Sequence, residues 1–158
     1  MKTTSLTLLI LATLAIAIIP SVFTNSDSQE QKAVANLSGQ EEVPPVQTQA
    51  TGIAEFTLMG DAVNYTVNAS NIQDATAGHI HLGNPRENGP VVITLFKYDT
   101  PMNQVSETGS FTAADQEGPM TGQPFQELGT AAFNGGLYVN IHTETNPNGE
   151  IRGQVQVS

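Results

Sequence analysis

Short runs in which hydrophobic and polar residues alternate recur along most of the chain, separated by clusters of Gly, Pro, Asn and Asp. Alternation with a period of two is typical of strands that have one buried and one solvated face. Beyond residue 33 the sequence shows no helical heptads, charge blocks or clear internal repeats. The pattern therefore predicts an all-β fold, an immunoglobulin-like Greek-key sandwich or barrel, and the length of 158 residues suits a single domain.

The clearest local unit is a hairpin over residues 51–69, with Gly60 and Asp61 as a two-residue turn. A leading glycine favours a type II′ turn. The alternate positions of both strands are polar, so one face should be buried and the other solvated. Closing the hairpin at this turn brings hydrophobic residues together on one face, in the pairs Leu58 with Val63, Phe56 with Tyr65, and Ala54 with Val67.

A second hairpin is predicted at the C-terminus, around the turn at residues 146–149. Two registers allow its hydrophobic residues to share a face, and they place His142 opposite either Glu150 or Arg152. Tyr138 and Asn140 lie with His142 on the non-core face. Glu150 would orient the imidazole by accepting its second N–H, whereas Arg152 would repel a cation and welcome an anion. The hydrophobic residues that must share the core face are Leu137, Val139, Ile141, Ile151, Val155 and Val157.

The residues between the two hairpins carry weaker signals. The composition predicts a strand at residues 78–82, a loop at 83–89, a buried strand at 91–96, a loop at 100–108 and a weak strand at 110–113. Residues 125–133 form the only segment that suits a helical turn, with Gly135 and Gly136 as its stop. We expect this helix to be a short decoration of the β fold.

The N-terminus has the pattern of a secretory signal. Met1 and Lys2 precede an uncharged, mostly apolar run from Leu6 to Phe23, which a polar stretch follows. Residues 1–24 are therefore predicted to be a signal peptide, with residues 25–32 as a tether and 33–158 as the folded domain. Because the apolar run approaches the length of a bilayer span, an uncleaved membrane anchor is the alternative. Both interpretations export the domain to an extracellular or periplasm-like space.

The chain is strongly anionic, with a formal net charge of −10. This charge argues against nucleic acid and anionic membrane surfaces as partners, so that a membrane contact is expected only through the N-terminal segment. The absence of cysteine excludes disulfides, a thiol nucleophile and a blue-copper thiolate. We expect Arg86 and Arg152 to form surface ion pairs, and Glu41 and Glu42 to form a solvated strand edge.

The three histidines of the chain fall in two strand-like motifs, with His79 and His81 in the first and His142 in the second. His79 and His81 project from the same face of a strand, about 7 Å apart at their origins. If folding brings His142 alongside, three imidazoles form a metal site that suits copper most readily, with zinc as the alternative. Asp74 and Glu144 are either a fourth ligand or loop caps. The alternative without a metal is a set of solvated or hydrogen-bonded surface histidines.

Five sequence blocks together resemble the CHRD domain, the module named after chordin. They are LSGQEEVPP at residues 37–45, GHIH at 78–81, NGPVV at 88–92, YVNIHT at 138–143 and NPNGEIRGQ at 146–154. The resemblance covers residues 33–158 and implies an immunoglobulin-like β-sandwich of the kind found in secreted bacterial and archaeal proteins as well as in chordin. The family usually reads His-Ile-His-Gly-Pro-Ala, and Leu82-Gly83-Asn84 departs from that pattern while both histidines are retained.

A weaker similarity links the His-x-His pair to the copper site of copper-zinc superoxide dismutase, another β-sandwich. The chain has no bridging histidine and no further histidines for a zinc site, so the zinc half of such an enzyme cannot be assembled. A shared fold does not transfer activity.

Three functions remain open at this point. The first is an exported domain that binds copper through His79, His81 and His142, with Tyr138, Asn140, Glu150 and Arg152 around them. The second is a metal-free interaction module that holds an envelope protein or a polysaccharide through loops such as residues 83–89. The third, a copper-dependent redox enzyme, has the least support, because no general acid or base is placed beside the metal and no catalytic residue is recognised.

Overall fold

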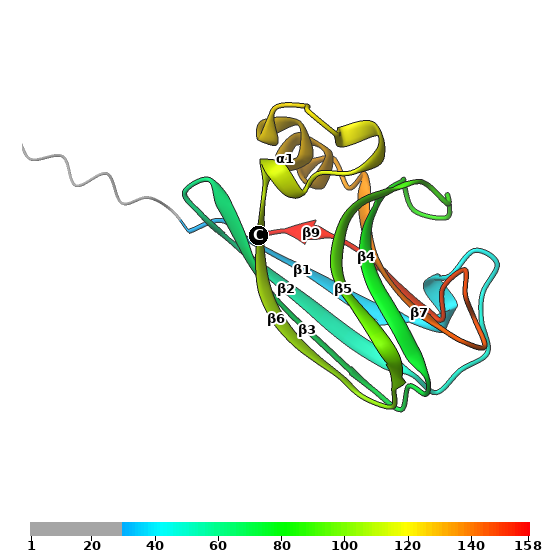
Figure 1. Cartoon of the computed structure of the whole chain (residues 1–158). Helices are drawn as coiled ribbons and strands as arrows, with labels where there is room; N and C mark the ends of the chain where they lie inside the picture. Colours follow the sequence, from blue (N-terminus) through cyan, green and yellow to red (C-terminus); the bar gives the residue numbers. More distant parts are fainter. Residues whose placement is uncertain (1–29) are drawn as a thin grey trace, which may run out of the picture.

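The computed structural model describes residues 30–158, which fold into one antiparallel sheet curled into a nearly closed barrel (Figure 1). The predicted signal or anchor, and most of the predicted tether, lie outside the described residues. The strands are β1 (Lys32–Ser38), β2 (Thr51–Met59), β3 (Ala62–Ser70), β4 (Ala75–Leu82), β5 (Val91–Met102), β6 (Val105–Thr112), β7 (Leu137–Thr143), β8 (Ile151–Gln154) and β9 (Gln156–Val157). The helical segments are α1 (Phe125–Phe133) and the 3-10 turns η1 (Gly39–Glu41), η2 (Ala113–Asp115) and η3 (Gly118–Met120).

The strand order is β5-β4-β7-β8-β1-β2-β3-β6, with β9 added to β1. After the run β4, β5 and β6, the chain returns so that β7 lies beside β4, which is a Greek-key connection. In the same way β6 lies beside β3 rather than beside β5. These pairings confirm the prediction of a single all-β domain.

The barrel is not closed by backbone pairing between its edge strands, β5 and β6, and side chains bridge this opening. The edge strands β5 and β6 are joined by only two residues, Asn103 and Gln104, but they diverge from there (Figure 1). The Tyr65 hydroxyl donates to the Leu95 carbonyl, and the Tyr98 hydroxyl donates to the Glu107 carboxylate at 2.7 Å. Polar contacts from tyrosines thus replace the missing ladder between the two edges.

The first predicted hairpin is present as β2 and β3, with the predicted register. Leu58 faces Val63, Phe56 faces Tyr65 and Ala54 faces Val67. Gly60 has φ of 63°, which the first central residue of a type II′ turn requires.

The second hairpin is formed by β7 and β8. Ile141 pairs with Ile151 and Asn140 with Arg152, so the next step along the strands brings His142 opposite Glu150. Ile151 and Val155 belong to the core. Val157 does not, because β9 has moved to β1 and leaves this side chain 39% exposed.

The prediction of a loop over residues 100–108 was wrong. Strand β5 runs to Met102 and β6 begins at Val105, which is buried and pairs with Ala69. Long-range pairing with β3 outweighs the weak local preference of this polar segment for a strand. The predicted strands at 78–82 and 91–96 lie within the longer strands β4 and β5. Of the predicted strand 110–113, residues 110–112 belong to β6 and Ala113 begins η2, whereas the helix at 125–133 has the predicted bounds.

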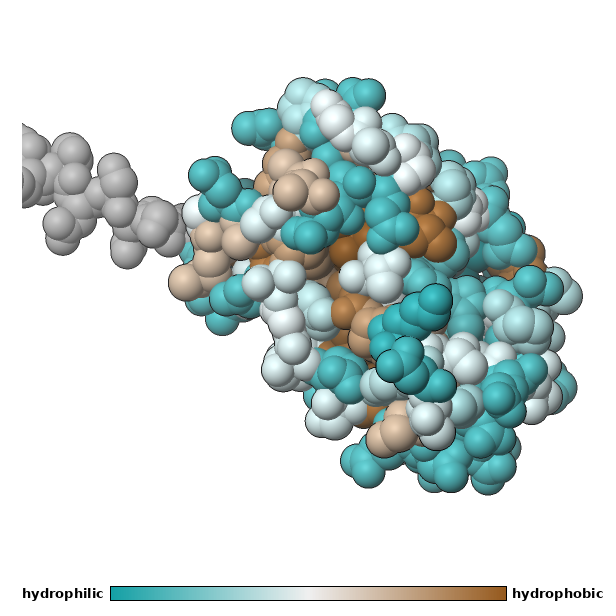
Figure 2. Space-filling model, in the orientation of Figure 1, coloured by the Kyte–Doolittle hydropathy of each residue, from teal (hydrophilic) through white to brown (hydrophobic). Residues whose placement is uncertain are grey.

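The core lies inside the barrel, and α1 covers one end of it (Figure 1). Two bulges in β5 opposite β4 leave Val92 and Leu95 without a partner on β4, and both side chains are buried. In the space-filling view, hydrophobic atoms reach the surface below the helical segment, while most of the visible face is polar (Figure 2). Within residues 30–158, no helix is both long enough and apolar enough to cross a membrane.

Two glycine-to-alanine changes should alter stability in opposite directions. A Cβ at Gly78 would lie 2.3 Å from the Phe96 ring, so Gly78→Ala should lower the free energy of unfolding by about 1–3 kcal/mol. A Cβ at Gly129 in α1 meets nothing within 4 Å, so Gly129→Ala should raise it by about 1 kcal/mol through helix propensity. Urea unfolding of the two variants measures both effects, and equal stabilities would contradict the packing at Gly78.

Candidate metal centre

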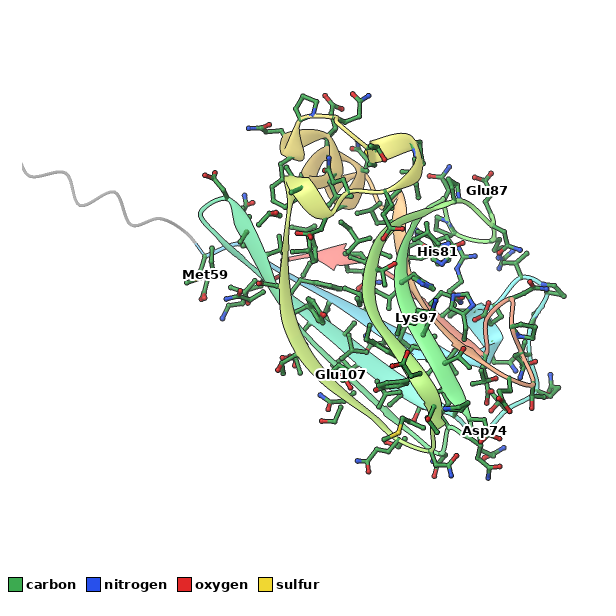
Figure 3. All side chains as sticks on the ribbon, viewed as in Figure 1. Met59, Asp74, His81, Glu87, Lys97 and Glu107 are labelled. Atoms are coloured by element: carbon green, nitrogen blue, oxygen red, sulfur yellow. The ribbon has the colours of Figure 1, made fainter. Side chains whose placement is uncertain are left out.

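The pairing of β4 with β7 brings the two histidine motifs together. His79 lies opposite Asn140, His81 opposite Tyr138, and Ala77 opposite His142. Since cross-strand partners share a face, all three histidines project from the same side of the sheet. This is the side away from the core, because the intervening Ile80 and Ile141 are buried inside the barrel. Figure 3 shows His81 on this outer side of β4, beneath the loop that carries Glu87.

The three imidazole rings form one compact cluster. Ring centroids are separated by 4.9 Å between His79 and His142, 5.7 Å between His81 and His142, and 5.8 Å between His79 and His81. One ligand nitrogen from each ring lies within 4.8 Å of the other two. Nitrogens bound to one zinc-sized ion at about 2.05 Å would be about 3.4 Å apart, so side-chain movements of about 1 Å would close the set around an ion.

In His81 and His142, a hydrogen bond to one ring nitrogen determines which nitrogen is free to bind a ligand. His81 Nδ1 lies 2.9 Å from the Gly89 carbonyl, and His142 Nδ1 lies 3.0 Å from the Pro147 carbonyl. A carbonyl only accepts, so each Nδ1 carries the proton and each Nε2 keeps its lone pair. Both Nε2 atoms are buried without a hydrogen-bond partner, and so is Nδ1 of His79.

Burial keeps these rings in the neutral form that binds metal ions. Desolvation, together with the nearby His142 and His81, lowers the pKa of His79 to about 4. Desolvation also lowers the pKa values of His81 and His142, against the opposing effect of their hydrogen bonds to backbone carbonyls. Protons therefore compete weakly for the three nitrogens at neutral pH.

An aromatic and cationic layer lies beside His81. The Tyr138 ring is stacked on the His81 ring at 4.8 Å, and the Arg152 guanidinium lies 3.5 Å from the Tyr138 centroid. Arg152 also donates to Asn88 and to the Asn84 carbonyl, which holds the loop of residues 83–89 over this face. Among the described residues Arg152 has no ion pair, so the expectation of a surface salt bridge was wrong for it. Its side chain is instead fully buried, as a cation–π and hydrogen-bonding partner.

Glu150 is not the residue that orients His142. Its carboxylate accepts hydrogen bonds from Thr48, Thr143 and Asn146 at 2.7, 2.8 and 3.2 Å. The Pro147 carbonyl takes the role that the sequence suggested for this carboxylate. Glu150 therefore stabilises the turn that positions His142.

Glu42 was missed as a member of this region, because its sequence context suggested a solvated edge. It is only 6% exposed and accepts a 2.6 Å hydrogen bond from Asn140. Desolvation raises the pKa of Glu42 to about 7, although Asn140 and the charge of Arg152 oppose that change. The turn η1 that follows β1 carries this carboxyl group onto the outer face of β7.

The carboxylates proposed as a fourth ligand lie outside the cluster. The only group of three or more ligand-type residues in residues 30–158 consists of the three histidines, without Asp74 or Glu144. Asp74 instead accepts at its carbonyl from the Glu144 backbone and so joins two turns. Glu117, which carried no sequence signal, is the nearer acidic residue: its charge acts on His79, and it accepts from the backbone of Thr94 opposite that histidine.

Replacing Glu42 should change stability in a pH-dependent way. Its pKa is about 7 in the fold and 4.5 ordinarily, so the folded state binds more protons than the unfolded state between these values. The free energy of unfolding therefore falls through this group as pH rises from 4.5 to 7. Glu42→Gln removes this titration. The free energy of unfolding of the variant, relative to that of the wild type, should therefore rise by about 2–3 kcal/mol across that range. Urea unfolding at several pH values tests this, and a difference that is constant with pH would contradict it.

A family model matches most of the chain. The model of the family described as the CHRD domain matches residues 33–155, more than three quarters of the chain. No curated protein matches this sequence. The match includes every strand that carries a histidine, and it agrees with the motifs on β4, β7 and β8. The chain therefore belongs to the CHRD domain family.

Proposed function

We propose that this CHRD domain binds one transition-metal ion, copper most readily, through His79, His81 and His142. The observation that carries the proposal is the convergence of three buried ring nitrogens that have no hydrogen-bond partner. A buried polar atom without a partner costs about 1–3 kcal/mol, and natural folds keep few of them. Of the four such side-chain atoms in the described residues, three belong to this cluster, and an ion among them would satisfy all three.

The donor set determines which metals are favoured. Three neutral imidazoles and no thiolate suit Cu(II), for which nitrogen sites have the highest affinity among the divalent first-row ions, and zinc is the alternative. Two donors are Nε2 atoms whose rings are oriented by backbone carbonyls, the usual support of a metal-bound histidine. Three protein ligands leave a coordination position for water or a small anion.

The domain is proposed to act outside the cytoplasm, because the apolar run from Leu6 to Phe23 has the form of an export signal or anchor. Its net charge of −10 favours the approach of cations in that space. A redox activity has no support from an acid or base placed at the cluster, so binding of the ion is the function that we propose.

Loss of one ligand should abolish tight binding. In isothermal titration of untagged protein with Cu(II), the wild type should bind one equivalent, and His79→Ala, His81→Ala and His142→Ala should each weaken binding by about 100-fold or more. Nitrogen hyperfine structure in the electron paramagnetic resonance spectrum of the wild type should be reduced in each variant.

Asp74→Asn and Glu144→Gln are the matched controls and should bind copper as the wild type does, since neither residue belongs to the cluster. Thermal unfolding of each metal-free variant checks that the fold is retained. Binding by His81→Ala that equals the wild type would refute the site. It would leave the metal-free interaction module as the better proposal, with the loop of residues 83–89 as its first candidate surface.

Export can be tested on the mature protein. Expression of the full chain in its host, followed by fractionation and intact mass measurement, should find the protein outside the cytoplasm. Cleavage near residue 24 would identify a signal peptide, and a full-length membrane-bound protein would identify an anchor. Full-length protein in the cytoplasmic fraction would overturn the proposed location.

A further inference from the structure

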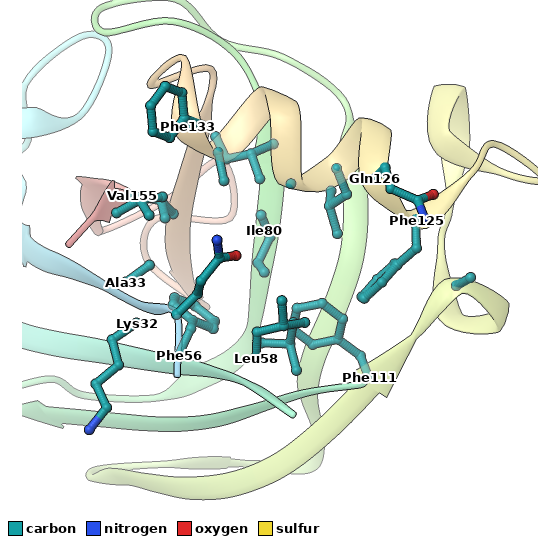
Figure 4. Close-up of a pocket in the computed structure, with 18 of the residues that line it drawn as sticks. Lys32, Ala33, Phe56, Leu58, Ile80, Phe111, Phe125, Gln126, Phe133 and Val155 are labelled. Atoms are coloured by element: carbon teal, nitrogen blue, oxygen red, sulfur yellow. The ribbon is translucent and has the colours of Figure 1, made fainter. Parts of the chain in front are cut away.

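A cavity of about 730 Å³ lies beneath α1 at one end of the barrel (Figure 4). Its volume falls within the range of roughly 300–1,000 Å³ that is usual for ligand sites. The walls include buried core residues from several strands and from the helix, so the cavity reaches into the hydrophobic core. These residues are Phe56, Ile80, Phe111, Leu128, Leu137 and Val155.

This cavity is separate from the histidine cluster, although the same strands form both. Ile80 lines the cavity from β4, while its neighbours His79 and His81 point to the other side of the sheet. Leu137 and Tyr138 divide in the same way on β7. A single layer of β-sheet therefore separates the apolar site inside the barrel from the polar site outside it.

The distribution of polar groups limits what the cavity can hold. Four polar side chains line it, those of Gln31, Lys32, Asp61 and Gln126, and all four are exposed and thus lie at its mouth. The buried side chains of the deep walls are all hydrophobic, so a buried polar group of a ligand would lose its hydrogen bonds to water without a side-chain replacement. A fitting ligand is apolar along its length and polar at one end.

Two exposed apolar side chains also lie at the mouth of the cavity. Phe133 at the end of α1 is 80% exposed, and Val157 is 39% exposed, and both line the opening. Single exposed apolar residues are common, but two at one opening favour the entry of an apolar molecule there.

One cation lies among the residues at this mouth. The Lys32 side chain is 59% exposed, and its ammonium pairs with Glu30 at 3.1 Å and extends away from the cavity (Figure 4). Such exposed pairs contribute little to stability, so the flexible side chain can exchange Glu30 for another carboxylate at small cost.

We propose that the cavity binds a long-chain fatty acid, with the acyl chain beneath α1 and the carboxylate at the mouth beside Lys32. The apolar depth selects the chain, the exposed polar mouth leaves the head group in water, and the Lys32 ammonium complements its charge. The site does not depend on the histidines, so it stands or falls independently of metal binding.

Calorimetry with hexadecanoic acid, in the presence of a metal chelator, tests the site on the purified protein. The wild type should bind one equivalent. Ala132→Phe adds a ring to a residue that lines the cavity and should abolish saturable binding. Thr130→Phe adds the same ring on the exposed side of the same helix and should leave binding unchanged. Thermal unfolding of both variants shows whether the fold is intact.

The contact with Lys32 has its own test. Lys32→Gln should weaken binding of the fatty acid by about fivefold and leave binding of hexadecanol unchanged. Equal losses for both ligands would overturn the carboxylate contact.

Absence of saturable binding to the wild type, or binding by Ala132→Phe that equals it, would overturn the proposal. So would a concentration-dependent dimer that Phe133→Ser dissociates, because the exposed apolar side chains at the mouth would then contact a second copy of the chain.

Discussion

The antiparallel pairing of β4 with β7 organises both the hydrophobic core and the candidate metal centre. On one side of this pair, Ile80 and Ile141 complete the hydrophobic core, and on the other side the three histidines meet. Because side chains alternate along a strand, a slip of one residue would turn the core residues outward and the imidazoles into the barrel interior. The register that stabilises the barrel and the register that assembles the candidate metal centre are therefore the same.

A second consequence of this pairing is a buried polar layer on the outside of the barrel. The turn η1 and the loop of residues 83–89 cover β7, so that Asn140 and Arg152 are almost fully buried although they lie on the non-core face. Hydrogen bonds to Glu42, Asn84 and Asn88 satisfy these groups. Within this otherwise satisfied layer the imidazole nitrogens have no partner, which supports the proposal that they bind a metal ion.

The two faces of the sheet thus carry two different chemistries. The outer face offers nitrogen donors in a polar setting, and the inner face offers an apolar cavity where α1 lies over the open end of the barrel. The short helix is therefore more than a decoration, since it forms one wall of that cavity (Figure 4). Hydrogen bonds from tyrosine side chains bridge the gap between β5 and β6. They hold the two edges of the barrel together where no backbone pairing does.

The strand-rich fold and the β2–β3 register could be predicted from the sequence alone, as could the bounds of α1 and the three histidines as candidate ligands. These features follow from local patterns, because alternation, turn glycines and residue type are properties of short segments. The residues around the site were decided only by the tertiary structure. Glu42 reaches Asn140 across 98 positions of the chain, Pro147 rather than Glu150 orients His142, and residues 100–108 become strand through pairing with β3. Burial and long-range pairing depend on which distant segments meet, and no local pattern records that.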